Sequence, residues 1–209
     1  MVKIKEMPYS EKYTYALDTI KLIEMFMPPL IQKHLGNEAV AELRSNWREG
    51  IKPIPEGASD EEKYEVTYGN FIWMAKSDVS FVRGHIGEEG IEKLKLAEVE
   101  ALKKENASPA LFILKLVRAI SPGSAFTMIA KQMAYQLQWI TPFSTDELTK
   151  NRVVYSMPRC KILDYPDTED LCTIGCQGIY TTWFAEQFRV ETKFKPQGNS
   201  CTCTMTPLR

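Results

Sequence analysis

The hydrophobic period of this chain changes near residue 134, and that change limits the folds it can adopt. Before it, apolar residues recur about every 3.6 positions, as in Leu17, Ile20 and Ile23, which predicts amphipathic helices. After it, short stretches alternate between apolar and polar residues, which predicts strands with one buried face. The chain is therefore expected to be α+β, with a mainly helical N-terminal part followed by an antiparallel sheet and a packed helix that carries cysteines.

Capping residues and prolines divide the first part into helices. Ser10 is expected to cap the first helix, and Pro28 and Pro29 to interrupt or kink it. Ser59 and Glu62 have the spacing of a capping box, which predicts the start of a long helix. Two further helices are expected to begin at serine–proline pairs, at 108–109 and 121–122.

The second part combines strand patterns with a helix. Partial alternation at 134–140, and a turn followed by β-branched residues within 147–157, predict a hairpin. A helix is expected over 169–188, and two more strands over 189–194 and 201–206. The expected division is a helical region, 1–133, and an α+β region, 134–209, which pack as one compact unit.

One short pattern occurs twice and contains both histidines of the chain. HLGNEAVAEL begins at His34 and HIGEEGIEKL begins at His85, each with a glycine two positions later. The match fades outside this window, so a local device is favoured over a duplicated domain. We expect each histidine in the last turn of a helix, with Gly36 or Gly87 in the left-handed position after it. The alternative is a pair of metal ligands, if the two corners meet in space.

Charge and hydropathy narrow the classes of partner. The chain has 26 Lys+Arg and 27 Asp+Glu residues, and this balance predicts no nucleic-acid partner. The N-terminus has no apolar signal region, and no stretch of about 18 apolar residues occurs. We therefore expect a cytoplasmic protein without a membrane partner. A small molecule is the expected partner, and the sequence leaves a homo-oligomer open.

All five cysteines lie in the last quarter of the chain, at Cys160, Cys172, Cys176, Cys201 and Cys203. The odd count and a reducing compartment argue against a disulfide framework. Residues 172 and 176 would share a helix face, and residues 201 and 203 a strand face. If the helix packs on the sheet, three or four of these sulfurs would come together.

Three interpretations of these thiols stay open. Cys160, Cys172, Cys176 and Cys201 could hold zinc or an iron–sulfur cluster. Cys172 or Cys176 could act as a nucleophile, with Glu186 as the acid/base group or Asp170 in its place. The thiols could also be small buried hydrophobes without a chemical role.

The order of these segments resembles the C-terminal pattern of the L-2-amino-thiazoline-4-carboxylic acid hydrolase family and of related uncharacterised prokaryotic proteins. The similar pattern runs over about 150–207, with cysteines at SMPRC, DLC and TIGC, a strand that carries Lys193, a glycine turn and a final strand that opens with Cys201. The resemblance implies ring-opening hydrolysis of a cyclic C–N bond in a small sulfur- and nitrogen-containing heterocycle. A thiolate or a thiolate-bound metal would activate water or the substrate.

The expected function is thus hydrolase-like, in a cysteine-based site between the helices and the sheet. The rival hypothesis is a non-enzymatic module that senses a small ligand, a metal or redox state through the same cysteines. An acid/base group beside the thiols would favour the enzyme, and a closed cage of four sulfurs would favour the structural or sensing site.

Overall fold

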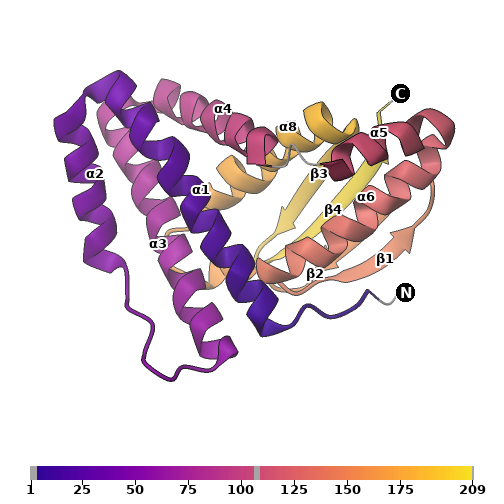
Figure 1. Ribbon diagram of the computed structural model, residues 1–209, viewed down its shortest axis with the longest axis horizontal. Coiled ribbons are helices and arrows are strands. Elements are labelled where there is room, and N and C mark those ends of the chain that lie inside the picture. Colours follow the sequence, from indigo (N-terminus) through magenta and orange to yellow (C-terminus); the bar gives the residue numbers. More distant parts are fainter. Residues whose placement is uncertain (1–3, 106–108, 209) are drawn as a thin grey trace.

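The computed structural model describes residues 4–105 and 109–208, and its first half is helical. Figure 1 shows α1 to α4 gathered at one end of the molecule and the sheet at the other, with α5 and α6 lying across the sheet. The helices are α1 (Tyr9–Leu35), α2 (Asn37–Gly50), α3 (Asp60–Ile86), α4 (Glu88–Glu105), α5 (Pro109–Ile120) and α6 (Pro122–Gln136).

Two predictions about α1 are wrong. The helix begins at Tyr9 after Pro8, so Ser10 lies inside it and caps nothing. The predicted interruption is also wrong, because the helix continues through Pro28 and Pro29 to Leu35. The helix is held on both sides of the prolines by buried residues, including Met27 and Ile31, and this packing outweighs the local cost of proline.

The predicted caps of the later helices have mixed outcomes. The capping box of α3 is confirmed: the Glu62 backbone N–H donates to Ser59 Oγ at 3.2 Å, and the Ser59 N–H donates to Glu62 Oε2 at 2.8 Å. Ser121 is the residue before α6, as predicted, but its hydroxyl donates to Ser124 Oγ instead of capping the helix. Ser108 lies outside the described residues.

A four-stranded antiparallel sheet follows the helices, so the predicted α+β class is confirmed. Its strands are β1 (Ser144–Leu148), β2 (Val153–Met157), β3 (Val190–Gln197) and β4 (Ser200–Pro207), in the spatial order β1-β2-β4-β3. The hairpin of β1 and β2 is confirmed, but the strand expected over 134–140 is wrong. There α6 runs to Gln136 and a 3₁₀ turn covers Leu137–Trp139, because Met133, Ala134 and Leu137 extend the helical apolar face into the core.

The sheet buries one face under helices, as is common for antiparallel sheets. Val153 and Tyr155 of β2 are opposite Met205 and Cys203 of β4, and all four side chains are buried. The Tyr155 hydroxyl donates to the Ala130 carbonyl of α6 at 2.6 Å. This bond fixes α6 on the sheet and places the end of that helix beside α1.

The connection from β2 to β3 contains the predicted helix over 169–188, but most of it has π geometry. Short α segments, α7 (Glu169–Leu171) and α8 (Thr181–Trp183), alternate with the π segments Cys172–Tyr180 and Phe184–Phe188. The Thr181 hydroxyl donates to the carbonyl of Cys176, five positions earlier. Because π turns are wide and occur often at functional sites, the space beside this helix is a candidate site.

The repeated pattern marks two helix ends, as predicted. Gly36 follows α1 with φ +86°, and Gly87 follows α3 with φ +79°. Their ψ angles are −176° and −163°, so both residues occupy an extended positive-φ region and not the left-handed helical region we expected. His85 stacks on Phe81 at 4.2 Å between ring centroids, and its Nδ1 lies 2.9 Å from the Phe81 carbonyl oxygen. His85 thus contacts its own helix end, and its Nε2 also lies 3.7 Å from Glu42 Oε1 of α2.

Gly87→Ala should destabilise the protein by about 1–2 kcal/mol, because positive φ is strained for any residue with a Cβ. Gly84→Ala is the matched control, three residues earlier inside α3. A Cβ at either position would meet no atom within 4 Å, so the two variants differ in backbone conformation and not in packing. Gly84→Ala should be neutral or stabilising by up to about 1 kcal/mol. Equal urea midpoints for the two variants would contradict this account of the repeat.

None of the described helices is long and apolar enough to cross a membrane. The predicted division at residue 134 stays a prediction, as do the predicted absence of a nucleic-acid partner and the open question of a homo-oligomer.

Candidate functional site

The structure brings four of the cysteines into one neighbourhood between the π helix and β4. Burial raises the pKa of the Cys176 thiol, and the nearby Cys172, Cys160 and Cys201 raise it further. Burial also raises the pKa of Cys201 to about 11, with smaller contributions from Cys172 and Cys160. Both shifts favour the protonated thiol at neutral pH, which is a poor nucleophile and a poor metal ligand.

These thiols do not form a metal site. Within residues 4–105 and 109–208, no group of three or more His, Cys, Asp or Glu side chains is arranged to hold a metal ion. The prediction of a metal-binding protein is therefore wrong for this part of the chain, although Cys160, Cys172, Cys176 and Cys201 are close together. Burial raises the pKa of the Cys160, Cys176 and Cys201 thiols, and the described residues do not enclose an ion.

The two predicted acid/base groups form surface ion pairs. Glu186 pairs with Lys103 of α4. Asp170 pairs with Arg83 of α3 at 2.5 Å, and its side chain is 54% exposed. The arrangement that would favour a thiol enzyme is thus missing among the described residues. The catalytic roles of Cys172, Cys176 and Glu186 remain untested predictions.

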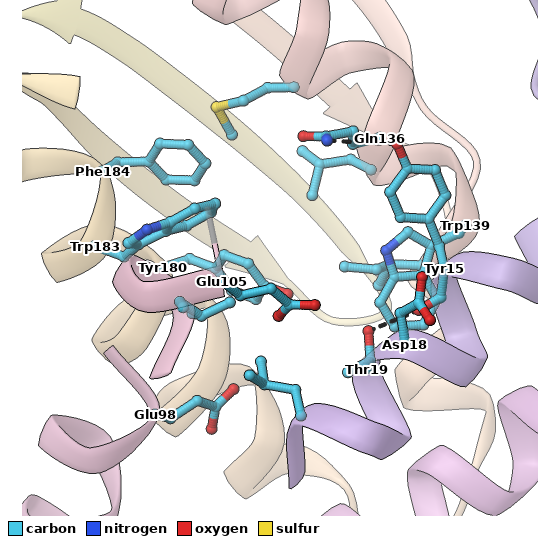
Figure 2. A pocket seen from close by; sticks show the side chains of 15 residues that line it. Tyr15, Asp18, Thr19, Glu98, Glu105, Gln136, Trp139, Tyr180, Trp183 and Phe184 are labelled. Carbon is cyan, nitrogen blue, oxygen red and sulfur yellow. Dashed lines mark hydrogen bonds between the residues drawn. The ribbon is translucent and has the colours of Figure 1, made fainter. Parts of the chain in front are cut away.

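A cavity of about 160 Å³ lies where α1, α4, the end of α6 and the π helix meet. Five of the fifteen residues that line it are aromatic. Figure 2 shows the rings of Tyr180, Trp183 and Phe184 on one side and those of Tyr15 and Trp139 on the other. We call this space the aromatic pocket.

Glu98 is the most unusual residue of the aromatic pocket. Its side chain comes from α4 and is enclosed by protein, yet it stays partly accessible because it faces the cavity. It has no hydrogen-bond or ion-pair partner among the described residues. Desolvation raises the pKa of this carboxyl to about 7. Glu98 is therefore balanced between its neutral and charged forms near neutral pH.

A second, smaller cavity of about 80 Å³ continues behind Glu98 towards the thiols. Thr19, Ile140 and Tyr180 line both cavities, and Cys176 lines the second one. The cysteine neighbourhood is thus adjacent to the aromatic pocket and separate from it.

Asp78 of α3 also lines the second cavity, but it is partnered. The indole N–H of Trp47 donates to Asp78 Oδ1 at 2.7 Å, and both side chains are buried. Desolvation raises the pKa of Asp78 well above its usual range, while the bond from Trp47 opposes this rise. Asp78 thus has a structural partner, in contrast to Glu98.

Hydrogen bonds from α3 fix the far wall of the aromatic pocket. The hydroxyl of Tyr64 donates to the carbonyl of Trp139 at 2.7 Å, and that of Tyr68 donates to the carbonyl of Ile140 at 2.9 Å. The Trp139 ring packs edge-on against Tyr68 and Phe71. The 3₁₀ turn therefore holds its indole in one position before any ligand binds.

Two more carboxylates line the aromatic pocket, Asp18 of α1 and Glu105 at the end of α4. Asp18 pairs with Lys21 at 2.8 Å on the solvent side. Partial burial raises the pKa of Glu105, and the neighbouring Asp18 raises it further. The lining thus combines an acidic edge near solvent, aromatic walls and the enclosed carboxylate of Glu98.

Sequence reasoning missed this pocket, although α4 carried a signal for it. Ile91, Leu94, Glu98, Ala101 and Glu105 follow one another at intervals of three and four, the spacing of a buried helix face. Glu98 and Glu105 are carboxylates at two positions of that face where an apolar core residue would be expected.

Comparison with known proteins gives little further information. No family model matches the chain, and no curated protein matches it. One solved structure that matches is a mutant H-NOX protein from K. algicida, described as Fe(II) unliganded. It shares 12% identity at a TM-score of 0.38, over 90% of this chain and 96% of that one.

The expected membership of the thiazoline hydrolase family is therefore wrong. No hydrolase was found by any comparison, and the solved structure that matches is an H-NOX protein. The predicted hydrolase function is wrong as well. That prediction depended on the family resemblance and on acid/base groups that the structure places in surface ion pairs. Zinc and iron–sulfur clusters would need a ligand group that the described residues lack.

Proposed function

We propose that this protein is a non-enzymatic module that binds a small ligand in the aromatic pocket. The observation that carries the proposal is Glu98, an enclosed carboxylate that has no partner among the described residues and faces a cavity with aromatic rings on two sides. Ligand sites are commonly apolar hollows with a few polar groups that fix the orientation of the ligand.

The energetic cost of Glu98 supports a binding role. An enclosed polar group without a hydrogen bond destabilises a fold by about 1–3 kcal/mol, and a charged one by more. An apolar residue on this face of α4 would avoid that cost. Asp78 shows how the same core accommodates a carboxylate with a structural role. Its carboxylate accepts a hydrogen bond from the indole N–H of Trp47.

The size of the pocket limits the ligand. An apolar cavity of about 150 Å³ holds one benzene molecule in an engineered protein. The aromatic pocket, at about 160 Å³, therefore suits a ligand with about one ring. The second cavity, behind Glu98, would admit a short extension towards Cys176.

The cysteines fit this module as neighbours of the ligand and not as its ligating groups. All five are free thiols, which is consistent with the reducing cytoplasm that we propose as its location.

The proposal is tested by screening small one-ring compounds of each charge type against the purified protein by thermal shift and calorimetry. At least one compound should bind and raise the melting temperature. Leu22→Trp should abolish the binding, because Leu22 is a buried residue of the pocket wall and the larger ring would fill the space.

Leu96→Trp is the matched control, because Leu96 lies on α4 with 63% exposure and is not part of the pocket wall. It should bind like the parent protein. Failure of every compound to bind the parent would overturn the proposal, as would unchanged binding by a folded Leu22→Trp variant.

A further inference from the structure

We infer that the aromatic pocket selects a small organic cation, an ammonium group attached to an apolar body of about one ring. This inference rests on the proposed function and adds the chemical class of the ligand. Three features of the pocket support it: the sign of its charges, the absence of a competing cation and the faces of its aromatic rings.

The charged residues of the pocket all have the same sign. Asp18, Glu98 and Glu105 are acidic, and the described lining includes no Lys, Arg or His. An anionic ligand would meet three carboxylates, of which only Asp18 has an ion-pair partner among the described residues, Lys21. A neutral ligand could donate a hydrogen bond to Glu98, but it would bring no charge to offset the ionised carboxylate.

Neighbouring basic residues do not neutralise Glu98. Lys21 pairs with Asp18 and its side chain is 61% exposed, so it points to solvent. Lys95 and Lys103, on the same helix as Glu98, pair with Glu92 and Glu100 at 2.8 and 2.7 Å. A cation supplied by a ligand would be the first partner of Glu98.

The aromatic walls suit the same ligand. Cations are attracted to the faces of Trp, Tyr and Phe rings within about 6 Å, and aromatic cages with a carboxylate recognise ammonium groups. Trp183 and Phe184 have ring centroids 4.8 Å apart and form one continuous wall with Tyr180. Trp139 and Tyr15 lie opposite them (Figure 2).

A metal ion is a poorer candidate for this charge. The described residues contain no group of three or more potential ligands close enough together to coordinate one. Aromatic surface instead separates the carboxylates of the pocket. A hydrated or coordinated metal ion would not contact that surface directly. An organic cation can contact both the carboxylate and the rings.

The test compares three one-ring probes of similar size by calorimetry at pH 8: benzylammonium, benzyl alcohol and benzoate. We expect benzylammonium to bind roughly tenfold or more tightly than benzyl alcohol, and benzoate not to bind. Glu98→Gln keeps the shape of the side chain and should weaken benzylammonium roughly tenfold while leaving benzyl alcohol unchanged. Glu92→Gln, an exposed change on the same helix, should alter neither.

The outcomes separate the two proposals. Benzyl alcohol that binds as tightly as benzylammonium, or an unchanged benzylammonium affinity in a folded Glu98→Gln variant, would overturn the choice of a cation and leave the ligand pocket standing. If none of the three probes and no compound of the wider screen binds, the pocket itself is overturned, and the cation with it.

Discussion

Glu98→Gln should make the stability of this protein less sensitive to pH between about 4.5 and 7. Desolvation raises the pKa of Glu98 from 4.5 to about 7, so the folded state binds this proton more tightly than the unfolded state does. The contribution is fully present below the unfolded pKa and is lost as pH rises through the folded pKa. The parent protein should therefore lose unfolding free energy across this window.

The expected size is at most about 3 kcal/mol, because each pKa unit corresponds to about 1.4 kcal/mol. Water in the cavity reduces this value, since it solvates the charged form. Glutamine cannot ionise, so the variant should lose this slope and become more stable relative to the parent at pH 8 than at pH 5.

Other groups near Glu98 also contribute to the pH dependence of stability in this measurement. Asp78 of α3 has a pKa raised in the same direction and should leave a residual slope in the variant. Asp18, Glu105 and Tyr180 face the same space from the other elements. Urea unfolding at pH 5, 6, 7 and 8 measures the effect, with Glu92→Gln as the exposed control. Parallel pH profiles for the parent and the Glu98→Gln variant would contradict a raised pKa at this position.

Local signals in the sequence were enough to predict much of the fold. The capping box at Ser59 and the glycines after His34 and His85 marked helix ends correctly, because caps act through groups a few residues apart. The prolines of α1 misled the prediction. Whether a helix survives Pro28 depends on the packing of distant residues against its neighbours, and no local pattern contains that information.

The candidate site could be predicted only in part, because it depends on contacts between distant segments. Glu98 and Asp78 both lie on apolar helix faces, so each could have been noted as an anomaly. The sequence could not show that Trp47 reaches Asp78 while no donor among the described residues reaches Glu98. Four of the cysteines lie close together, as predicted, but the burial that raises the pKa of Cys176 follows from the packing of distant segments.

The second large effect on stability is expected at Asp78, the carboxylate that has a hydrogen-bond partner. Trp47→Phe should destabilise the protein by about 2–3 kcal/mol, because it removes the donor to Asp78 and leaves a buried carboxyl oxygen unsatisfied. Trp73→Phe is the matched control. Its indole donates to the Asn46 carbonyl at 3.1 Å, but the side chain is 38% exposed and water can replace the lost donor. That variant should lose less than about 1 kcal/mol.

A double-mutant cycle separates the hydrogen bond from the loss of ring volume. Asp78→Leu alone should also be destabilising, because it leaves the buried Trp47 N–H without an acceptor. Combining it with Trp47→Phe removes both polar groups, and the cost of the pair should fall below the sum of the single costs by about 1 kcal/mol or more. Additive costs in urea unfolding would show that the bond contributes nothing beyond packing. Non-additive costs would show that the Asp78 carboxyl depends on its hydrogen bond from Trp47, a partner for which Glu98 has no counterpart among the described residues.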